Sequence, residues 1–179
     1  MNIALYGGSF DPPHIGHLQV VHAALKALDI DKLIVVPAFV NPFKMGTHAP
    51  AHLRLSWLRT IFADDVEVEV SDLEVSENRA VTTIETVEKI ASKYAKIYFI
   101  IGADNLASLQ KWHRFEALNN LVTWVVATRD GIAIDKSYQQ LNVEHPISSS
   151  QLRSNINDEH LPQEVASEIK TYYEVNHAR

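Results

Sequence analysis

Two histidines lie three residues apart near the start of the chain, within a stretch that is rich in glycine and proline. The stretch reads Gly7-Gly8-Ser9-Phe10-Asp11-Pro12-Pro13-His14-Ile15-Gly16-His17. Glycines let a ligand approach the main chain, and imidazoles can donate hydrogen bonds to phosphoryl oxygens and be protonated near neutral pH. These residue types predict a phosphate site at which His14 and His17 act on the bound group. The alternative is a surface loop with incidental histidines, which leaves the clustering unexplained.

The elements predicted on either side of this stretch support a phosphate site. An apolar run at residues 3–6 predicts a strand before it. A helical pattern follows it, with Leu18, Val21, Leu25 and Leu28 on one face. The start of a helix presents unpaired N–H groups and the positive end of the helix dipole, and phosphates bind there. The histidine stretch is therefore predicted to be the loop between a strand and a helix.

Strands and helices alternate along the rest of the chain. Further strands are predicted at residues 32–37, 66–70, 97–101 and 121–128. Helical patterns occur at residues 51–62 and 84–94, in a short stretch that holds Trp112 and His113, at 147–153, and from Pro162 onward with Val165, Ile169 and Tyr172 inward. This alternation, with several strands apolar throughout, predicts a doubly wound parallel α/β sheet covered on both faces. We expect residues 1–179 to form a single domain.

Composition narrows the class of protein. The chain has 179 residues, 46% of them hydrophobic, and no cysteine, so disulfides and thiolate metal sites are excluded. Lysine and arginine number 16 and acidic residues 22, which gives a net charge of −6. Such a chain has no overall attraction for nucleic acid or for an anionic membrane. Because no signal-peptide pattern or membrane-length apolar run is found, we expect a cytoplasmic protein.

Polar residues follow several of the predicted strands. Gly102 and Asp104 follow the strand at 97–101, and Arg129 follows the next strand. Lys44 follows the strand at 32–37. Ligands of open α/β sheets bind outside the carboxyl ends of the strands, so we expect these residues to line one cleft with the glycine stretch. Taken singly, each has an ordinary explanation as a turn residue or a solvated cation.

A second pattern that can bind phosphate is Ile147-Ser148-Ser149-Ser150-Gln151-Leu152-Arg153. Serines before a helix ordinarily act as caps. Here three hydroxyl groups face a helix start, and Arg153 lies about one turn inside the helix. That combination can bind phosphate and add a fixed positive charge.

These two stretches resemble the signatures of the nucleotidyltransferase superfamily. The first is similar to the pattern HxGH, and the second to ISSTxxR with Ser150 in place of the usual threonine. In length and neighbouring residues the chain is most similar to the bacterial nicotinate-nucleotide adenylyltransferases. The resemblance implies a Rossmann-like nucleotidyltransferase fold and adenylyl transfer, in which the phosphate of nicotinate mononucleotide attacks the α-phosphorus of ATP and releases pyrophosphate.

The resemblance also implies roles for individual residues. The catalytic group would be His14, His17, Lys44 and Arg153, and ATP would bind Gly7, Gly8, Ser9, Phe10, Gly102, Asp104, Ser148 and Ser149. The acceptor would bind Lys44, Thr83, Trp112 and Arg129, with Trp112 stacking on the pyridine ring. A metal held by the protein is not expected, because no convincing third ligand joins the two histidines. Mg²⁺ is expected to arrive with ATP, largely coordinated by water.

Two departures from the family pattern bear on the acceptor. The histidine that usually shortly precedes the lysine is missing at Asn41-Pro42-Phe43. Where the family often reads R-x-S-Y-T-x-x-T, only Arg79, Thr83 and Thr86 match. A helix that starts at Thr83 can still receive a pyridine carboxylate on its free N–H groups.

Other functions remain open from the sequence. The same chemistry could use another acceptor, such as phosphopantetheine, and a non-catalytic nucleotide-binding sensor could use the same fold. Class I aminoacyl-tRNA synthetases also contain HIGH, but they need RNA-binding domains for which this chain has neither length nor basic surface. We therefore expect small-molecule substrates, ATP and nicotinate mononucleotide, with no nucleic acid and no membrane. The sequence leaves open whether the chain forms a homo-oligomer.

Overall fold

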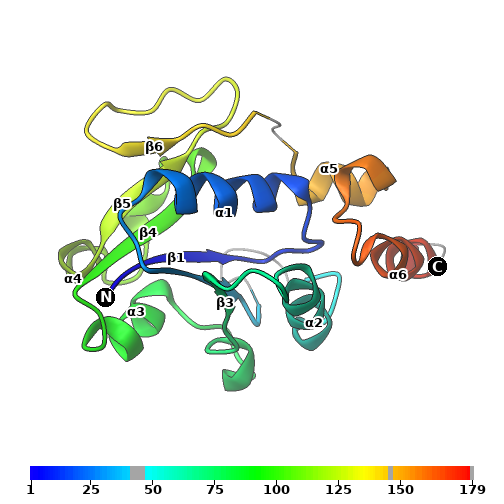
Figure 1. The fold of residues 1–179 in the computed structure, drawn as a ribbon, viewed down its shortest axis with the longest axis horizontal. Coiled ribbons are helices and arrows are strands. Elements are labelled where there is room, and N and C mark those ends of the chain that lie inside the picture. The colour runs from blue at the N-terminus through cyan, green and yellow to red at the C-terminus, as the bar shows by residue number, and fades with distance from the viewer. Residues whose placement is uncertain (41–46, 145–146, 178–179) are drawn as a thin grey trace.

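The computed structural model describes residues 1–40, 47–144 and 147–177, and within these residues six parallel strands form one sheet (Figure 1). The strands are β1 (Asn2–Gly8), β2 (Lys32–Pro37), β3 (Val68–Val70), β4 (Lys96–Gly102), β5 (Thr123–Ala127) and β6 (Gln139–Leu141). Their order in the sheet is β3-β2-β1-β4-β5-β6. The order reverses between β1 and β4, and a doubly wound sheet binds its ligand at such a point. The predicted fold class is confirmed.

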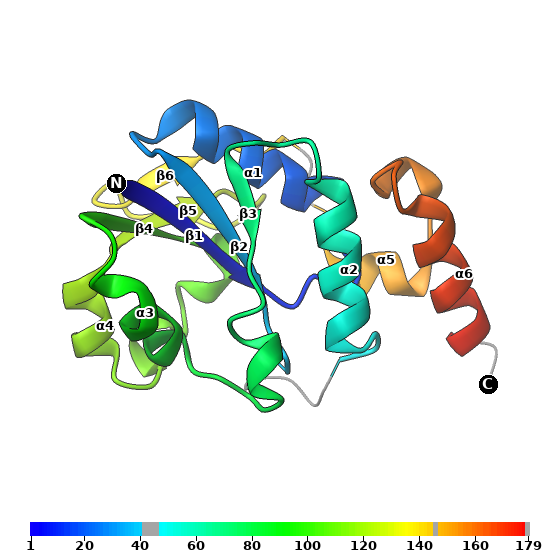
Figure 2. The same ribbon diagram turned by 60° about the horizontal axis from the view of Figure 1, so that its bottom comes forward.

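Helices cover both faces of the sheet. Helices α1 (Ile15–Ala27) and α2 (Ala51–Ile61) pack on one face, and α3 (Thr83–Ala91) and α4 (Phe115–Leu121) pack on the other. Helices α5 (Ser149–Ser154) and α6 (Ala166–His177) lie beside α2, beyond the end of the sheet (Figure 2). Short 3₁₀ turns occur at η1 (Val75–Glu77), η2 (Ala103–Asn105), η3 (Leu109–Lys111) and η4 (Asp158–His160).

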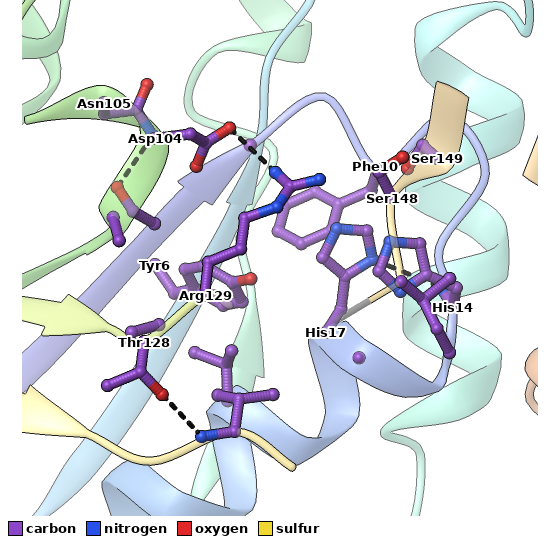
Figure 3. Close-up of a pocket in the computed structure, with 18 of the residues that line it drawn as sticks. Tyr6, Phe10, His14, His17, Asp104, Asn105, Thr128, Arg129, Ser148 and Ser149 are labelled. Carbon is purple, nitrogen blue, oxygen red and sulfur yellow. Dashed lines mark hydrogen bonds and ion pairs between the residues drawn. The ribbon is translucent and has the colours of Figure 1, made fainter. Parts of the chain in front are cut away.

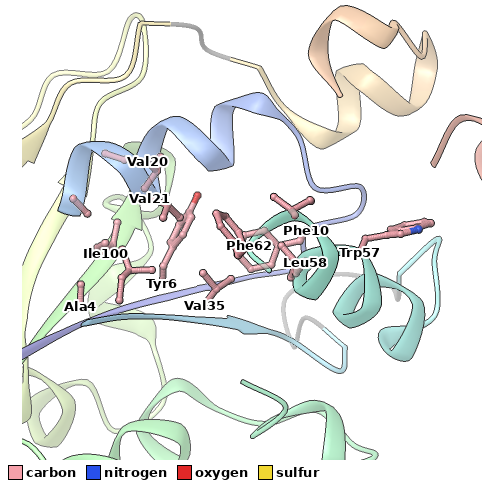
Figure 4. Packing of buried hydrophobic residues seen from close by; sticks show 14 of the residues in the cluster. Ala4, Tyr6, Phe10, Val20, Val21, Val35, Trp57, Leu58, Phe62 and Ile100 are labelled. Carbon is pink, nitrogen blue, oxygen red and sulfur yellow. The ribbon is translucent and has the colours of Figure 1, made fainter. Parts of the chain in front are cut away.

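Alternation along the buried strands divides the core into two clusters. Ala4 and Tyr6 of β1 face the cluster under α1 and α2, whereas Ile3 and Leu5 face the cluster under α3 and α4. Successive side chains of a strand point to opposite faces, so an apolar run supplies both clusters. Figure 4 shows the first cluster, which reaches from the sheet to the aromatic side chains around Phe10. Leu152 of α5 and Tyr173 of α6 belong to the same cluster, so the end of the chain packs against its beginning.

Some predicted elements are wrong in position. The strand predicted at 121–128 begins only at Thr123, because residues 115–121 form α4, which the sequence analysis missed. The edge strand β6 was also missed, because only Leu141 of its three residues is buried and no apolar run marks it. No helix in the described part of the chain is long and apolar enough to cross a membrane.

Two further differences occur at turns. Trp112 and His113 lie between η3 and α4, not in a helix, and Arg114 has a positive φ of 52° that separates the two elements. The last helix begins at Ala166, one turn later than predicted. The N–H of Val165 bonds to the carbonyl oxygen of Pro162, which makes residues 162–165 a separate turn before α6.

Candidate active site

Two adjoining cavities open at the carboxyl ends of β1 and β4. The first has a volume of about 550 Å³ and the second a volume of about 260 Å³. Both are lined by Gly7, Gly8, Gly102, Asp104 and Asn105. They therefore meet at the point where the strand order reverses, as the sequence predicts for a ligand site.

Most of the predicted phosphate and ATP residues line the first cavity. These are Gly7, Gly8, Phe10, His14, His17, Gly102, Asp104, Ser148 and Ser149, together with Arg129. They come from four separate stretches of the chain, which the sheet brings to one edge (Figure 3). Residues that follow different strands therefore lie around one cavity.

The two signature histidines form a stacked pair at the start of α1. Their ring centroids are 3.7 Å apart and their planes differ by 18°. The backbone N–H of His14, the residue that caps α1, donates a hydrogen bond to Nδ1 of His17 at 3.1 Å. Because Nδ1 accepts, the neutral ring of His17 carries its proton on Nε2. His17 is thereby prepared to donate a hydrogen bond from Nε2 to an oxygen of a ligand.

His14 is held in its neutral form by its surroundings. Its side chain is buried, and that burial, with further contributions from His160 and Arg129, lowers the pKa of His14 to about 3. An imidazole can ordinarily be protonated near neutral pH, but for His14 desolvation disfavours the charged form. An anionic phosphate at this place would raise the pKa of His14 again.

Phe10 packs against the histidine pair on the side of His17. Its ring is buried and lies edge-to-face against His17, with centroids 4.7 Å apart. Phe10 has a positive φ of 48°, which turns the chain so that the ring points into the core. A Cβ at Gly8 would come within 3.2 Å of that ring, so the glycine leaves room for the aromatic support.

The second signature touches the first. Ser148 caps α5 and accepts a hydrogen bond from the N–H of Gln151 at 3.1 Å. Ser149 Oγ donates to the carbonyl oxygen of Pro12 at 3.0 Å, across 137 residues of sequence. The guanidinium group of Arg153 donates to the carbonyl oxygen of Asp11 and, at 3.2 Å, to Ser150 Oγ. Arg153 therefore lies against the histidine loop, next to Ser150, which lines the first cavity.

An ion pair spans the boundary between the two cavities. Arg129 Nη1 lies 3.1 Å from Asp104 Oδ2, and Figure 3 shows the Arg129 side chain between Asp104 and the histidine pair. A Cβ at Gly102 would lie 2.6 Å from Asp104 Oδ1, so Gly102 allows the carboxylate to fold back over β4. Arg129, assigned to the acceptor by resemblance, is placed with the residues assigned to ATP.

The remaining acceptor residues line the second cavity. Thr83, at the start of α3, and Trp112 are both part of its wall, as is Ser9. Trp112 is half-buried and packs edge-to-face against Phe99 and Trp124, at centroid distances of 6.4 Å and 6.1 Å. Lys44 lies outside the described residues.

A buried carboxylate that the sequence analysis did not single out holds the histidine loop in place. Asp11 accepts hydrogen bonds from the N–H groups of His48 and Ala49, at 2.6 Å and 3.0 Å, and from the hydroxyl group of Tyr173. Burial opposes ionisation, but these hydrogen bonds outweigh it and hold the pKa of Asp11 below its usual value. Asp11 therefore joins the loop to α6 as an ionised carboxylate.

Arg54 is a second residue that the sequence analysis missed. Its side chain is 0% exposed and donates to three carbonyl oxygens, those of Ala49 at 2.9 Å, Phe39 at 2.8 Å and Ser9. One guanidinium group thereby ties α2 to the chain after β2 and to the start of the histidine loop. The available signal was a charge on the apolar face of a predicted helix, beside Leu55 and Leu58.

Within the described residues, no group of three or more histidine, cysteine, aspartate or glutamate side chains is placed to hold a metal ion. Asp104, a carboxylate in the first cavity, is paired with Arg129. The donors of this cavity are mostly N–H groups and hydroxyls, which suit phosphate oxygens. They fit a cation that enters bound to a triphosphate better than a metal held by the protein alone.

Comparisons with known proteins agree with this geometry. A family model described as cytidylyltransferase-like matches residues 5–155. A probable nicotinate-nucleotide adenylyltransferase of Sulfurimonas denitrificans is 52% identical over 99% of this chain and 97% of its own length. The protein of the same name from Nitratiruptor sp. is 49% identical, over 97% of this chain and 99% of its own length.

The chain belongs to the nicotinate-nucleotide adenylyltransferase family. A solved structure extends the likeness to the fold. Plasmodium falciparum nicotinic acid mononucleotide adenylyltransferase, complexed with NaAD, matches with a TM-score of 0.78 at 22% identity, over 98% of this chain and 97% of that one. The two proteins therefore share a fold.

Proposed function

We propose that the protein transfers the adenylyl group of ATP to nicotinate mononucleotide, forming the deamido form of NAD and pyrophosphate. One observation carries the proposal: the serines and arginine of the second signature contact the loop of the stacked histidines at the mouth of one cleft. Relatives that are 49% and 52% identical over nearly the full chain bear the name of this activity. We also propose that the whole chain works as one domain, because α5 and α6 share the core of the sheet.

The two cavities fit the two substrates. The first is the larger and has the histidines, the serines and Arg129, which suit a triphosphate. The second has the ring of Trp112 and the start of α3, which suit a pyridine ring with an anionic substituent. Because the cavities share the glycines at the ends of β1 and β4, the acceptor phosphate would meet the α-phosphate at this boundary.

The chemistry requires no covalent bond to the protein. An oxygen of the acceptor phosphate forms the new bond to the α-phosphorus, and the bond to the bridging oxygen of pyrophosphate breaks. The Nε2–H of His17 donates to a phosphoryl oxygen as negative charge builds up there. His14 stacks on His17 and fixes its ring, and Arg153 adds a positive charge beside the same loop. Lys44 is proposed to add a further positive charge at the phosphates.

Mg²⁺ is proposed to enter with ATP. It would neutralise phosphate charge. Asp104, the carboxylate that lines the first cavity and pairs with Arg129, would be available to it. The remaining coordination would come from water and phosphate oxygens. We further propose that the enzyme works in the cytoplasm, where ATP is available.

Release of pyrophosphate by the purified protein tests the function. We expect release only when ATP and a pyridine mononucleotide are both present, with nicotinate mononucleotide preferred. Phosphopantetheine with ATP is the matched alternative acceptor. Pyrophosphate release from ATP with phosphopantetheine, but not with a pyridine mononucleotide, would show a different acceptor. ATP binding without any pyrophosphate release would show a nucleotide sensor.

Replacement of Trp112 by alanine tests the assignment of the second cavity. Stacking of an aromatic side chain on a base contributes about 1–3 kcal/mol, so we expect the KM for nicotinate mononucleotide to rise about tenfold or more. The KM for ATP should stay near the wild-type value, since Trp112 does not line the first cavity. Trp112→Phe keeps a ring and should recover most of the loss. An equal effect on both KM values would contradict the assignment.

A further inference from the structure

Glu74 is an acidic residue in the acceptor cavity that the proposed chemistry does not use. It lies just before η1 and lines the second cavity together with Thr83 and Trp112. Thr86 Oγ1, one turn inside α3, donates a hydrogen bond to Glu74 Oε1 at 2.6 Å. Within the described residues, no other hydrogen bond to this carboxyl group is formed, so Oε2 is available to a ligand in the cavity.

The charged groups around Glu74 come from several elements. On α3, Glu85 is the like charge and Lys89 the opposite charge that act on it. Lys89 is itself held by Glu77 of η1, and Glu85 is held by Arg79. Asp104 adds a further carboxylate to the lining of the cavity.

This environment makes Glu74 titrate near neutral pH. Burial is the main cause and raises the pKa of Glu74 to about 7. The hydrogen bond from Thr86 opposes the shift, Glu85 adds to it, and Lys89 reduces it. A carboxyl group with this behaviour can be a hydrogen-bond donor below neutral pH and an acceptor above it.

We propose that Glu74 reads the substituent on the pyridine ring of the acceptor, and so sets the preference between nicotinate and nicotinamide mononucleotide. The inference rests on the proposed function, because it takes the second cavity as the site of the pyridine ring. When protonated, Glu74 donates a hydrogen bond to the nicotinate carboxylate. When ionised, it repels that carboxylate and accepts a hydrogen bond from the amide of nicotinamide.

The proposal predicts that acceptor preference depends on pH. Only protonated Glu74 pairs well with the nicotinate carboxylate. With a pKa of about 7, the protonated fraction falls about tenfold between pH 6 and pH 8. We expect kcat/KM for nicotinate mononucleotide, divided by that for nicotinamide mononucleotide, to fall by at least this factor, because the ionised form that accepts from the nicotinamide amide becomes more abundant over the same interval. The phosphate group that both acceptors carry titrates alike in each, so it cancels in this ratio.

The experiment measures that ratio from about pH 5.5 to about pH 8.5 for the wild-type enzyme and Glu74→Gln. The glutamine amide can accept from Thr86 and donate to a carboxylate at every pH, so the ratio should become independent of pH. Glu88→Gln is the matched control, because Glu88 lies exposed on α3, pairs with Arg114 and lines neither cavity. It should keep the wild-type pH dependence.

Other outcomes overturn the proposal in distinguishable ways. A flat ratio in the wild-type enzyme, or an unchanged slope in Glu74→Gln, removes the role of Glu74 while leaving the proposed function intact. An equal loss of activity with both acceptors in Glu74→Gln would indicate a structural role only. Absence of pyrophosphate release with either acceptor in the wild-type enzyme would remove the proposed function as well.

Thermal unfolding gives a readout that needs no activity. The pKa of Glu74 is raised on folding, so the folded protein binds more protons than the unfolded chain between the two pKa values. The stability that Glu74 contributes is therefore complete below its unfolded pKa and is lost as the pH rises toward 7. We expect the Tm of Glu74→Gln, relative to wild type, to increase from about pH 5 to about pH 8. A constant difference would contradict the titration.

Discussion

Replacement of His17 by alanine is expected to lower kcat by about 100- to 1000-fold, the usual cost of one donor that stabilises transition-state charge. The physical reason lies in the fixed tautomer: the N–H of His14 donates to Nδ1 of His17, so the neutral ring carries its proton on Nε2 and can donate a hydrogen bond to a phosphoryl oxygen. That hydrogen bond strengthens as charge builds on the transferring phosphate. The KM values for ATP and nicotinate mononucleotide should change much less than kcat. Steady-state pyrophosphate release measures all three constants.

His22→Ala is the matched control for this prediction. His22 lies on the exposed side of α1, and removing it should leave kcat near the wild-type value. Because His17 also packs on Phe10, the Tm of His17→Ala should be recorded to show that the fold persists. Turnover near wild type in a folded His17→Ala enzyme would remove His17 from the mechanism.

Replacement of Arg54 by methionine is expected to reduce the free energy of unfolding by about 3–5 kcal/mol. Methionine has a similar length but supplies no donor, so the buried carbonyl oxygen of Ala49 and the partly buried ones of Phe39 and Ser9 lose this donor. An unpaired buried polar group costs about 1–3 kcal/mol. Unfolding in urea, followed by circular dichroism, measures the change. We also expect kcat to fall, because Ser9 begins the histidine loop.

Arg59→Met on the same helix is the control for Arg54. Arg59 is half exposed and lies 3.5 Å from Asp72, so its loss should change the free energy of unfolding by no more than about 0.5 kcal/mol. Arg54→Lys keeps one donor group, so its free energy of unfolding should lie between those of Arg54→Met and Arg59→Met. If the free energy of unfolding of Arg54→Met is within about 1 kcal/mol of the wild-type value, the three carbonyl contacts do not stabilise the loop.

The sequence predicts the parts of this site whose signals are local. Glycines, prolines and spaced histidines mark the loop after β1, and serines before an arginine mark the start of α5. Their meeting could also be expected, because the carboxyl ends of parallel strands share one edge. The stacking of His14 on His17 could not be read, since it depends on the capping geometry at the start of α1.

The contacts between residues that are distant in the sequence could not be predicted, for a different reason. Asp11 and Tyr173 are 162 residues apart, and no sequence pattern around either residue indicates that the two form a hydrogen bond. Arg54 shows only a charge on an apolar helix face, and that pattern does not say which carbonyl groups it will bind. Glu74 follows a strand with alternating acidic residues, and its burial depends on the η1 turn against α3. In each case the partner comes from tertiary packing.

The contact between Tyr173 and Asp11 has a consequence for biosynthesis. A ribosome makes the histidine loop long before α6, and domains fold progressively as the chain emerges. The nascent polypeptide therefore carries every strand of the sheet before its loop receives the tyrosine hydroxyl. Catalytic competence should appear late in translation, once residue 173 has left the exit tunnel, so chains stalled before that point would be folded in large part yet inactive.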